Sequence, residues 1–524
     1  YKNLVKDQLG VETIIINYIP KDFATREWAD INIGFYGVKL NEKFWNGIQI
    51  KLGTDINSKQ KKKWKNLNRI EVRHGFSNPP IFISWENSWV SNWDGHYGWN
   101  SSNYSDSAKP TNASILESQG TSVLISSTDS SYFDNFETIN ANLGNDSFFL
   151  AGDPGNDITL QGEYGQDNFE FNYAFSSNIL ADGGNDNDIF TISNSQYTGK
   201  LELDGGLNDD TLKGSSLSDH YGWSPANYSD SSIATNSAIL SEKGTASLIS
   251  SIDKSYFSNI ETITANQGAD TFYFGGDPSS NLTLQGNAGN DEYHFNYNLT
   301  KNITAVGGAD SDVFTITKSP SSSGVLTMQG NGAADQFNFS SNITNGTIVT
   351  FGNAGTDTFQ FDNANITSNV TLYTGDDADK LSFVSKNSGS NLEVSDFSSA
   401  SDYFEFNSAA FSGSEGHVLV FGTVQDHGGG ANEFVANNID GNIIAFDNTN
   451  TQIGTAPGTD LLSRNDDLWL YDTSSGYLYY DEDGDQFMDD AVTIAKVKNS
   501  GNILDNTTFK SSDIQYDDDG TTSS

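Results

Sequence analysis

Cysteine is absent from this sequence of 524 residues, and basic residues, proline and methionine are scarce. Without cysteine, no disulfide framework can hold the chain together. Only 27 Lys and Arg stand against 69 Asp and Glu, a formal net charge of −42. This balance excludes nucleic acid as the main partner, because phosphate backbones are bound by basic side chains. No hydrophobic run approaches the roughly 18 residues of a membrane span. Aromatic residues make up 12% of the chain, enough to build a core.

The few basic residues are concentrated at the N-terminal end. Residues 1–75 hold 14 Lys and Arg against 8 acids, whereas residues 76–524 hold 13 against 61. The densest basic stretch is the lysine run at 59–65. Such asymmetry indicates partners of opposite charge. We expect the basic segment either to face an anionic cell-surface glycan, such as lipopolysaccharide, or to pack against the acidic remainder.

A tandem duplication is visible in the middle of the chain. The tetrapeptide His-Tyr-Gly-Trp at 96–99 returns at 220–223, and Leu-Gln-Gly at 160–162 returns at 284–286. Both pairs are 124 residues apart. A block of this length has therefore been duplicated.

A shorter period lies inside each block. The pattern Gly-x-x-Gly-x-Asp-x-apolar aligns on an Asp that recurs after 21, 21, 22, 60, 21, 21, 23, 22 and 22 residues. Its members are Asp146, Asp167, Asp188, Asp210, Asp270, Asp291, Asp312, Asp335, Asp357 and Asp379. An aromatic residue or leucine follows each Asp by two positions. We call these ten acids the aspartate column.

The residue types in this period predict a parallel β-solenoid. Gly and Asn in the turn adopt left-handed backbone conformations at little cost. The following Phe-x-Phe alternation, as at 169–171 and 337–339, is typical of a short strand with one buried face. Helical repeats fit poorly, because the apolar spacing lacks a period of 3.6. We expect an all-β chain with coils of about 21–23 residues.

Four domains follow from these patterns. They are a basic, β-rich N-terminal domain (1–93) with strands near 11–19, 31–36 and 81–85, a first solenoid block (94–217), a second block with extra coils (218–400) and a β-rich C-terminal domain (401–524).

Stacking the coils brings the acids of the column close together. At about 4.8 Å and an effective dielectric constant near 20, each neighbouring pair of carboxylates repels by roughly 3 to 4 kcal/mol. A divalent cation between successive turns would remove this repulsion, and Ca²⁺ accepts six to eight oxygens, including the carbonyls of Gly-rich turns. We therefore expect the ten acids to be calcium ligands. The alternative is that each Asp only caps amides of its turn.

A second acidic pattern occurs near the C-terminus. Asp481, Asp483 and Asp485 stand at alternate positions, as the first ligands of an EF-hand loop do. The loop lacks Gly at its sixth position and Glu at its twelfth, where Gln486 and Val492 stand. These three acids are candidate metal ligands, and an acidic turn in a β-hairpin is the alternative.

The repeat resembles the nonapeptide of the repeats-in-toxin family of calcium-dependent secreted bacterial proteins. The segments 183–190 and 307–314 match all but one defined position of Gly-Gly-x-Gly-x-Asp-x-apolar. The stretches 402–410 and 468–485 resemble the region that precedes the type I secretion signal in such proteins. The family carries two motifs in each coil of about 18 residues, whereas this chain has one motif in a longer coil. The resemblance implies calcium binding, export by type I secretion and an extracellular location.

The resemblance extends to bacterial surface-layer proteins, which are non-enzymatic, acidic and poor in cysteine. It implies a structural subunit that self-assembles into a layer or filament. The alternative is a secreted adhesin or carbohydrate-binding protein, in which exposed Trp93, Trp99 and Trp223, with Tyr97 and Tyr221, would stack on sugars. A polysaccharide-modifying enzyme is the weakest hypothesis. His96 and His220 are equivalent members of the duplication, whereas a catalytic group is normally single, and no nucleophile elbow, zinc helix or phosphate loop occurs.

Overall fold

In the computed structural model, the described residues form strands and the turns between them, with one short 3-10 helix, η4 (Ser511–Asp513). N-terminal to residue 136 the described residues are the strands at 13–22, 27–34, 69–73, 81–83, 88–90, 95–99, 114–118 and 132–133. From there the described ranges are 136–193, 197–224, 238–244, 255–386, 388–411, 418–426, 432–436, 438–439, 442–443, 445–447, 468–482, 488, 490–505 and 508–517. None of the described helices is long and apolar enough to cross a membrane.

The contacts divide the chain into two compact units. Unit 1 comprises residues 1–214 and 254–260, and unit 2 comprises 215–253 and 261–524. The segment 254–260 therefore belongs to unit 1, although residues 215–253 before it belong to unit 2.

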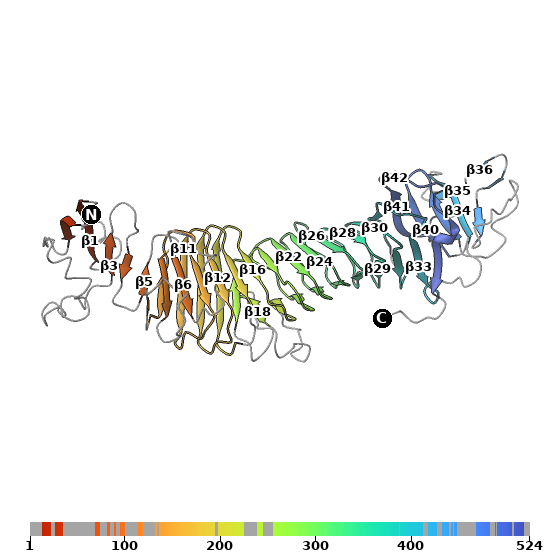
Figure 1. Ribbon diagram of the computed structural model, residues 1–524. Helices are drawn as coiled ribbons and strands as arrows, with labels where there is room; N and C mark the ends of the chain where they lie inside the picture. Colours follow the sequence, from red (N-terminus) through yellow and green to blue (C-terminus); the bar gives the residue numbers. More distant parts are fainter. Residues whose placement is uncertain are drawn as a thin grey trace. The chain divides into compact units, whose positions relative to one another are not determined.

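Unit 1 contains a stack of coils, each contributing one strand to each of two parallel sheets (Figure 1). One sheet contains β9 (Thr138–Asn140), β11 (Ile158–Tyr164), β13 (Ile179–Asn185), β15 (Leu201–Leu207) and β19 (Tyr256–Ser258). The other contains β6 (Gly95–Trp99), β10 (Ser147–Leu150), β12 (Asn168–Phe171), β14 (Ile189–Ile192) and β16 (Thr211–Lys213). Phe148, Phe169 and Phe190 are partners in this register, which places equivalent residues of each coil side by side.

The N-terminal strands also belong to unit 1. They are β1 (Thr13–Asp22), β2 (Glu27–Gly34), β3 (Arg69–Arg73), β4 (Ile81–Ile83) and β5 (Ser88–Val90). β1 pairs antiparallel with β2 and parallel with β3, and β3, β4 and β5 follow as antiparallel neighbours. β5 pairs parallel with β9, so these strands continue a sheet of the solenoid. Two further strands, β7 (Ser114–Ser118) and β8 (Tyr132–Phe133), pair parallel beyond β6.

Unit 2 repeats the arrangement with more coils. Its first sheet contains β20 (Thr262–Thr264), β22 (Leu282–Asn287), β24 (Ile303–Gly308), β26 (Val325–Asn331), β28 (Thr347–Ala354), β30 (Asn369–Asp376) and β32 (Leu392–Val394). Its second contains β17 (His220–Trp223), β21 (Thr271–Phe274), β23 (Glu292–Phe295), β25 (Val313–Ile316), β27 (Gln336–Phe339), β29 (Thr358–Phe361), β31 (Lys380–Phe383) and β33 (Tyr403–Asn407). β18 (Ile239–Glu242) pairs beside β17.

The C-terminal region adds one more strand to each of the two sheets of unit 2. β41 (Val492–Asn499) pairs parallel with β32, and β43 (Ile514–Asp517) pairs parallel with β33. Around them lie β34 (Val418–Asp426), β35 (Asn432–Ala436), β38 (Ala445–Asp447), β39 (Leu468–Asp472), β40 (Tyr477–Asp481) and β42 (Asn502–Ile503), with the separate hairpin of β36 (Asn438–Ile439) and β37 (Asn442–Ile443). The stack of unit 2 thus ends in a small β-rich region.

The core of each stack consists of aligned side chains. The residue two positions after each column aspartate is buried, and where it is aromatic its ring stacks on the aromatic equivalent in a neighbouring coil. In unit 2 the rings of Phe272, Tyr293, Phe314, Phe337 and Phe359 lie 4.6 to 4.9 Å apart with nearly parallel planes. Because parallel strands are spaced by about the same distance, the backbone pairing sets this stacking.

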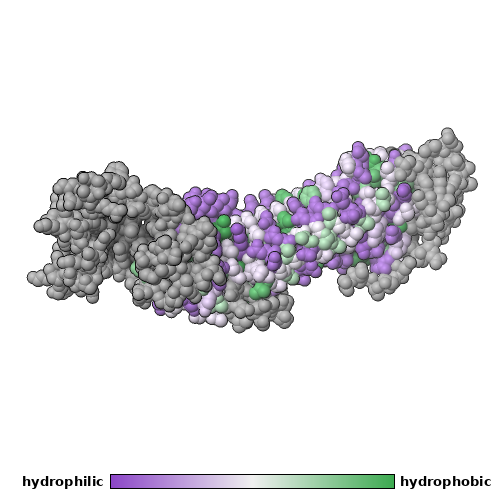
Figure 2. Space-filling model, in the orientation of Figure 1, coloured by the Kyte–Doolittle hydropathy of each residue, from purple (hydrophilic) through white to green (hydrophobic). Residues whose placement is uncertain are grey.

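The outward positions of the same strands are partly exposed and mostly polar. Figure 2 shows one face on which hydrophilic and neutral residues predominate, with a few hydrophobic residues. Strand alternation therefore separates a closed interior from a wetted exterior. The prediction of an all-β chain built on a parallel β-solenoid of 21–23 residues per coil is confirmed.

Candidate functional site

The Gly-rich turn before each column aspartate is held by left-handed residues. The position four before the Asp has a positive φ in all ten coils, as at Asn287 (71°) and Glu163 (75°). Gly and Asn occupy this position except at Glu163, because they adopt such angles most easily. The turn thereby directs the aspartate that follows into the coil.

All ten aspartates of the column are buried. Each has 2% or less of its surface exposed, in the same interior as the stacked aromatic rings. The sequence motif placed these acids in one column, and the structure brings them together within each unit. Burial of a row of carboxyl groups demands partners for their oxygens.

One oxygen of each carboxyl group finds such a partner in the backbone of the preceding coil. The Asp291 N–H donates to Asp312 Oδ1 at 2.8 Å, and the Asp312 N–H donates to Asp335 Oδ1 at 2.8 Å. The Asp312 carbonyl in turn accepts from the Gln336 N–H. The same side-chain bond occurs throughout the column, at Asp146, Asp167, Asp188, Asp210, Asp270, Asp291, Asp357 and Asp379. The column is a ladder of hydrogen bonds from coil to coil.

The other oxygen, Oδ2, is left without a donor in most rungs. Among the described residues, it is buried and has no hydrogen-bond partner at Asp167, Asp188, Asp270, Asp291, Asp312, Asp335, Asp357 and Asp379. Leaving a buried acceptor without a partner costs about 1–3 kcal/mol, and more when the group is charged. This makes the protonation state of these carboxyls the central chemical question of the site.

A glycine five residues before the aspartate makes room for this oxygen. A Cβ on Gly307 would lie 2.1 Å from Asp312 Oδ2, and a Cβ on Gly286 would lie 1.8 Å from Asp291 Oδ2. Neither glycine has a positive φ, so close approach rather than backbone conformation favours glycine here. In three coils nearer the ends of the stacks the position holds Ala141, Ala265 or Thr374.

Two members of the ladder lie outside the sequence motif. Asp219 begins the column of unit 2 and donates its N–H to Asp270 Oδ1, and Asp402 ends it by accepting the Asp379 N–H at 3.2 Å. Both oxygens of these end members have donors. Asp219 accepts from Ser215 N (2.7 Å) and Ala238 N (2.9 Å), and Asp402 Oδ2 accepts from Ser398 N (2.8 Å).

Burial raises the pKa of the carboxyl groups in the column. The pKa rises to about 9 for Asp167 and Asp270, about 8 for Asp188, Asp335 and Asp379, about 7 for Asp291 and Asp312, and about 6 for Asp357. The hydrogen bond from the preceding coil opposes the rise, and neighbouring acids add to it. Low solvation therefore favours the neutral carboxylic acid over the carboxylate.

The column does not offer calcium the set of ligands that it requires. Ca²⁺ takes six to eight oxygens at about 2.3–2.6 Å. Here one carboxyl oxygen in each coil is already bound to an N–H, and across the described residues no three acidic or imidazole side chains gather in a way that could hold a metal ion. Calcium-dependent folding stays a prediction from the sequence, and these residues do not fit it.

The remaining predicted ligands lie near the C-terminus. Asp481 ends β40 and is buried, whereas Asp483 and Asp485 lie outside the described residues. The lysine run at 59–65 and Trp93 also lie outside them.

The duplicated aromatic segments belong to the core. Tyr97, Trp99, Tyr221 and Trp223 are each at most 1% exposed. Trp223 stacks on Phe274 with ring centroids 4.2 Å apart, and Tyr221 stacks on Phe272 at 5.2 Å. They are therefore not available to stack on sugars.

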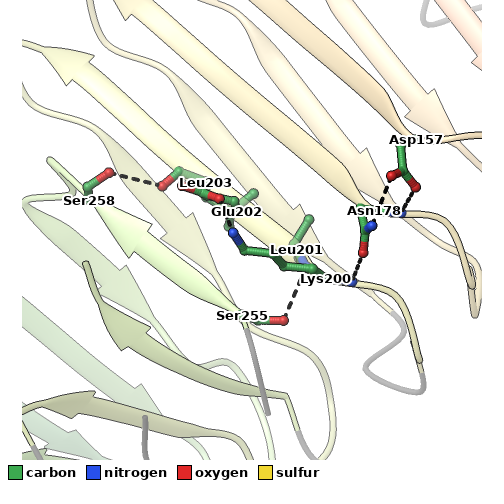
Figure 3. Close-up of polar contacts among 8 residues, drawn as sticks. All are labelled: Asp157, Asn178, Lys200, Leu201, Glu202, Leu203, Ser255 and Ser258. Carbon is green, nitrogen blue, oxygen red and sulfur yellow. Dashed lines mark hydrogen bonds and ion pairs between the residues drawn. The ribbon is translucent and has the colours of Figure 1, made fainter. Parts of the chain in front are cut away.

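A second ladder runs along another turn of the coil, on the surface. In unit 1 the Asn178 N–H donates to Asp157 Oδ1, and the Lys200 N–H donates to Asn178 Oδ1, both at 2.9 Å (Figure 3). In unit 2, Asn281 and Asn302, which directly precede β22 and β24, accept the equivalent bonds. Asn342 and Asn365 accept bonds of the same kind at a different turn, several residues before β28 and β30. We call this exposed row the asparagine ladder. Sequence reasoning missed it, although the Asn or Asp that precedes each inward Ile or Leu is its signal.

No protein-family model, curated protein or solved structure matches this chain. The likeness to the repeats-in-toxin family therefore rests on the quoted motifs alone.

Proposed function

We propose that this chain is a non-enzymatic structural protein of the bacterial cell surface, secreted from the cell and able to assemble into a layer or filament. The observation that carries the proposal is the solid interior of the two stacks. Inward positions of the described coils hold mainly buried aromatic, aliphatic and aspartate side chains, so the interior of the repeat is taken up by packing. A repeat of this kind extends a scaffold by adding equivalent coils.

The placement of histidines and acids also favours a structural role over catalysis. His96 and His220, the duplicated histidines, are each buried at the start of their own block. In the described part of the chain, no cluster of His, Asp and Glu has the form of a metal centre. The outward faces carry mainly polar side chains of medium size.

Copies with a net charge of −42 repel one another, so their assembly requires positive charge at the contacts between them. Two sources are at hand, cations from solution and the basic segment 1–75. In this proposal Ca²⁺ acts as a counterion between acidic copies, and the basic segment contacts either an anionic glycan or a neighbouring copy. Both interactions weaken as salt shortens the Debye length to about 8 Å.

Electron microscopy of the purified full chain tests the proposal. We expect ordered sheets or filaments when CaCl₂ is added, and weaker assembly in MgCl₂ or NaCl at matched ionic strength. Monomers under all these conditions would overturn it. A monomer that binds a purified cell-surface glycan would instead support the adhesin.

A triple variant separates the two roles of the basic segment. Lys61→Gln, Lys62→Gln and Lys63→Gln together should release the protein from cells at moderate salt and leave assembly intact. Continued cell binding with loss of assembly would show that the run contacts a neighbouring copy.

A further inference from the structure

At several rungs of the aspartate column the unpartnered oxygen lies beside another acceptor. The point that a Gly162 Cβ would occupy lies 1.9 Å from Asp167 Oδ2 and 2.6 Å from the carbonyl oxygen of Gly183, one coil further on. At Gly286 the corresponding neighbours are Asp291 Oδ2 at 1.8 Å and the Gly307 carbonyl at 2.8 Å. A carboxylate oxygen and a carbonyl oxygen therefore border the same small space, and two acceptors repel each other unless a hydrogen lies between them.

We infer that the interior aspartates of the column are neutral carboxylic acids that carry their proton on Oδ2, so that the column is a calcium-independent hydrogen-bonded ladder joining the coils. Each carboxyl group would use both oxygens, Oδ1 as acceptor from the preceding coil and Oδ2–H as donor toward the following one. The requirement of one proton for each rung matches one unpartnered oxygen at eight rungs, Asp167, Asp188, Asp270, Asp291, Asp312, Asp335, Asp357 and Asp379.

The surroundings of a central rung support the neutral form. Asp312 is 1% exposed, and the groups that act on it electrostatically are Asp291 and the exposed turn residue Asp310, both acids. The nearby Tyr293 hydroxyl donates to the Val306 carbonyl and so is not directed at the carboxyl group. Burial raises the pKa of Asp312 to about 7 and that of Asp270 to about 9, in agreement with the geometry.

The ends of the column provide an internal contrast. Asp219 and Asp402 are also buried, yet two or more N–H or O–H groups donate to each, on both oxygens. Burial raises the pKa of both carboxyl groups, and these donors oppose that rise because they stabilise the carboxylate. The inference therefore assigns protons to the interior rungs and leaves the two ends able to ionise.

Infrared spectroscopy of the full chain in D₂O tests the inference directly, because a protonated carboxyl group absorbs above the amide I band and a carboxylate absorbs below it. We expect the protonated band in the wild type near neutral pH. The triple variant Asp188→Asn, Asp312→Asn and Asp379→Asn should lower it by roughly a third, because it removes three of the eight interior rungs that lack a partner on Oδ2.

A matched control uses exposed acids of the same three coils. Asp186, Asp310 and Asp377 each stand two residues before one of these rungs, and each accepts an N–H from a turn glycine of the preceding coil. Changing all three to Asn removes only a weaker charge repulsion and none of the buried carboxyl groups, so it should lower the protonated band much less than the interior variant does.

The wild type alone can overturn the inference, even if the interior variant fails to fold. A folded wild type without the band at pH 6 would mean that the rungs are ionised. A band that converts to carboxylate when CaCl₂ is added, together with bound calcium that the interior variant loses and the control retains, would establish calcium ligation instead.

Discussion

Coils of both units contain two turn ladders that use the same kind of hydrogen bond in opposite surroundings. In the aspartate column the acceptor is a buried Asp, and in the asparagine ladder it is an exposed Asn or Asp. The bonds also run in opposite directions, because Asp312 accepts from the preceding coil whereas Asn302 accepts from the following one. Together they fasten each coil to both neighbours.

The two ladders shift the pKa of aspartate in opposite directions. At exposed Asp157, the hydrogen bonds from Asn178 lower the pKa of the carboxyl group. At buried Asp167 a similar bond is outweighed by burial, and the pKa rises to about 9. The comparison teaches that solvation, not the hydrogen bond, decides whether a turn aspartate is charged.

Raising the pH should produce the largest effect, because it acts on many rungs at once. A carboxyl group with a raised pKa contributes stability that is complete below its ordinary pKa of about 3.9 and is lost as the pH rises through the folded value. The folded values run from about 6 at Asp357 to about 9 at Asp167 and Asp270. We expect the free energy of unfolding in urea to fall by several kcal/mol between pH 5 and pH 9.

The triple Asn variant of the interior provides the control for this titration. Its pH dependence should be shallower than that of the wild type, whereas the exposed Asn variant should follow the wild type. A wild type that gains stability over this range would contradict neutral rungs.

Single truncations should separate the two ladders. Asp312→Ala removes the acceptor for the buried Asp291 N–H and opens a cavity, which should cost about 2–4 kcal/mol. Asn302→Ala exposes the Val325 N–H to water and should cost about 0.5–1 kcal/mol. Urea unfolding at pH 6 measures both, and equal costs would mean that burial does not distinguish the ladders.

The sequence predicted the period, the column and the buried apolar residue two positions after each aspartate, because all three recur at one spacing. Asp402 was missed although it follows Asp379 by 23 residues and precedes Phe404 by two, since its turn lacks the glycines. Asp219 was missed because it follows Asp210 by only nine residues, where the chain passes from unit 1 to unit 2.

The direction of the carboxyl groups was harder to predict. An aspartate in a turn binds water or cations when its side chain points outward, and it loses its solvation when the side chain points inward. Both directions are compatible with the same sequence motif. The glycine five residues before the aspartate allows the carboxyl group to point inward, because its missing Cβ leaves space for Oδ2. That space is apparent only once the coil is folded.

Exchanging the residue types between ladders should have a smaller effect. Asn302→Asp keeps an acceptor in water, as Asp157 does naturally, and should change the free energy of unfolding by no more than about 0.5 kcal/mol at pH 7. Asp312→Asn keeps the acceptor but leaves one buried N–H without a partner, which should cost about 1–2 kcal/mol at pH 5. A larger loss of unfolding free energy for Asn302→Asp than for Asp312→Asn would mean that the exposed ladder is the more sensitive of the two.

The smallest expected effect is that of calcium on the column. Asp291 stands in a well-matched motif, whereas Asp379 follows Thr374 in a degenerate one, so calcium ligation predicts that Asp291→Ala is the more damaging change. The ladder predicts similar losses, because each residue accepts one N–H, at 2.7 and 2.8 Å, and each is fully buried. We expect the free energies of unfolding of the two variants to differ by less than about 1 kcal/mol. The wild-type free energy of unfolding should be the same in CaCl₂ and in chelator. Circular dichroism should show β-structure of the wild type under both conditions. Two outcomes would show that the buried acids depend on a metal ion: unfolding of the wild type by chelator, or loss in chelator of the stability difference between Asp291→Ala and the wild type. The two ladders would then differ in cation binding rather than in solvation.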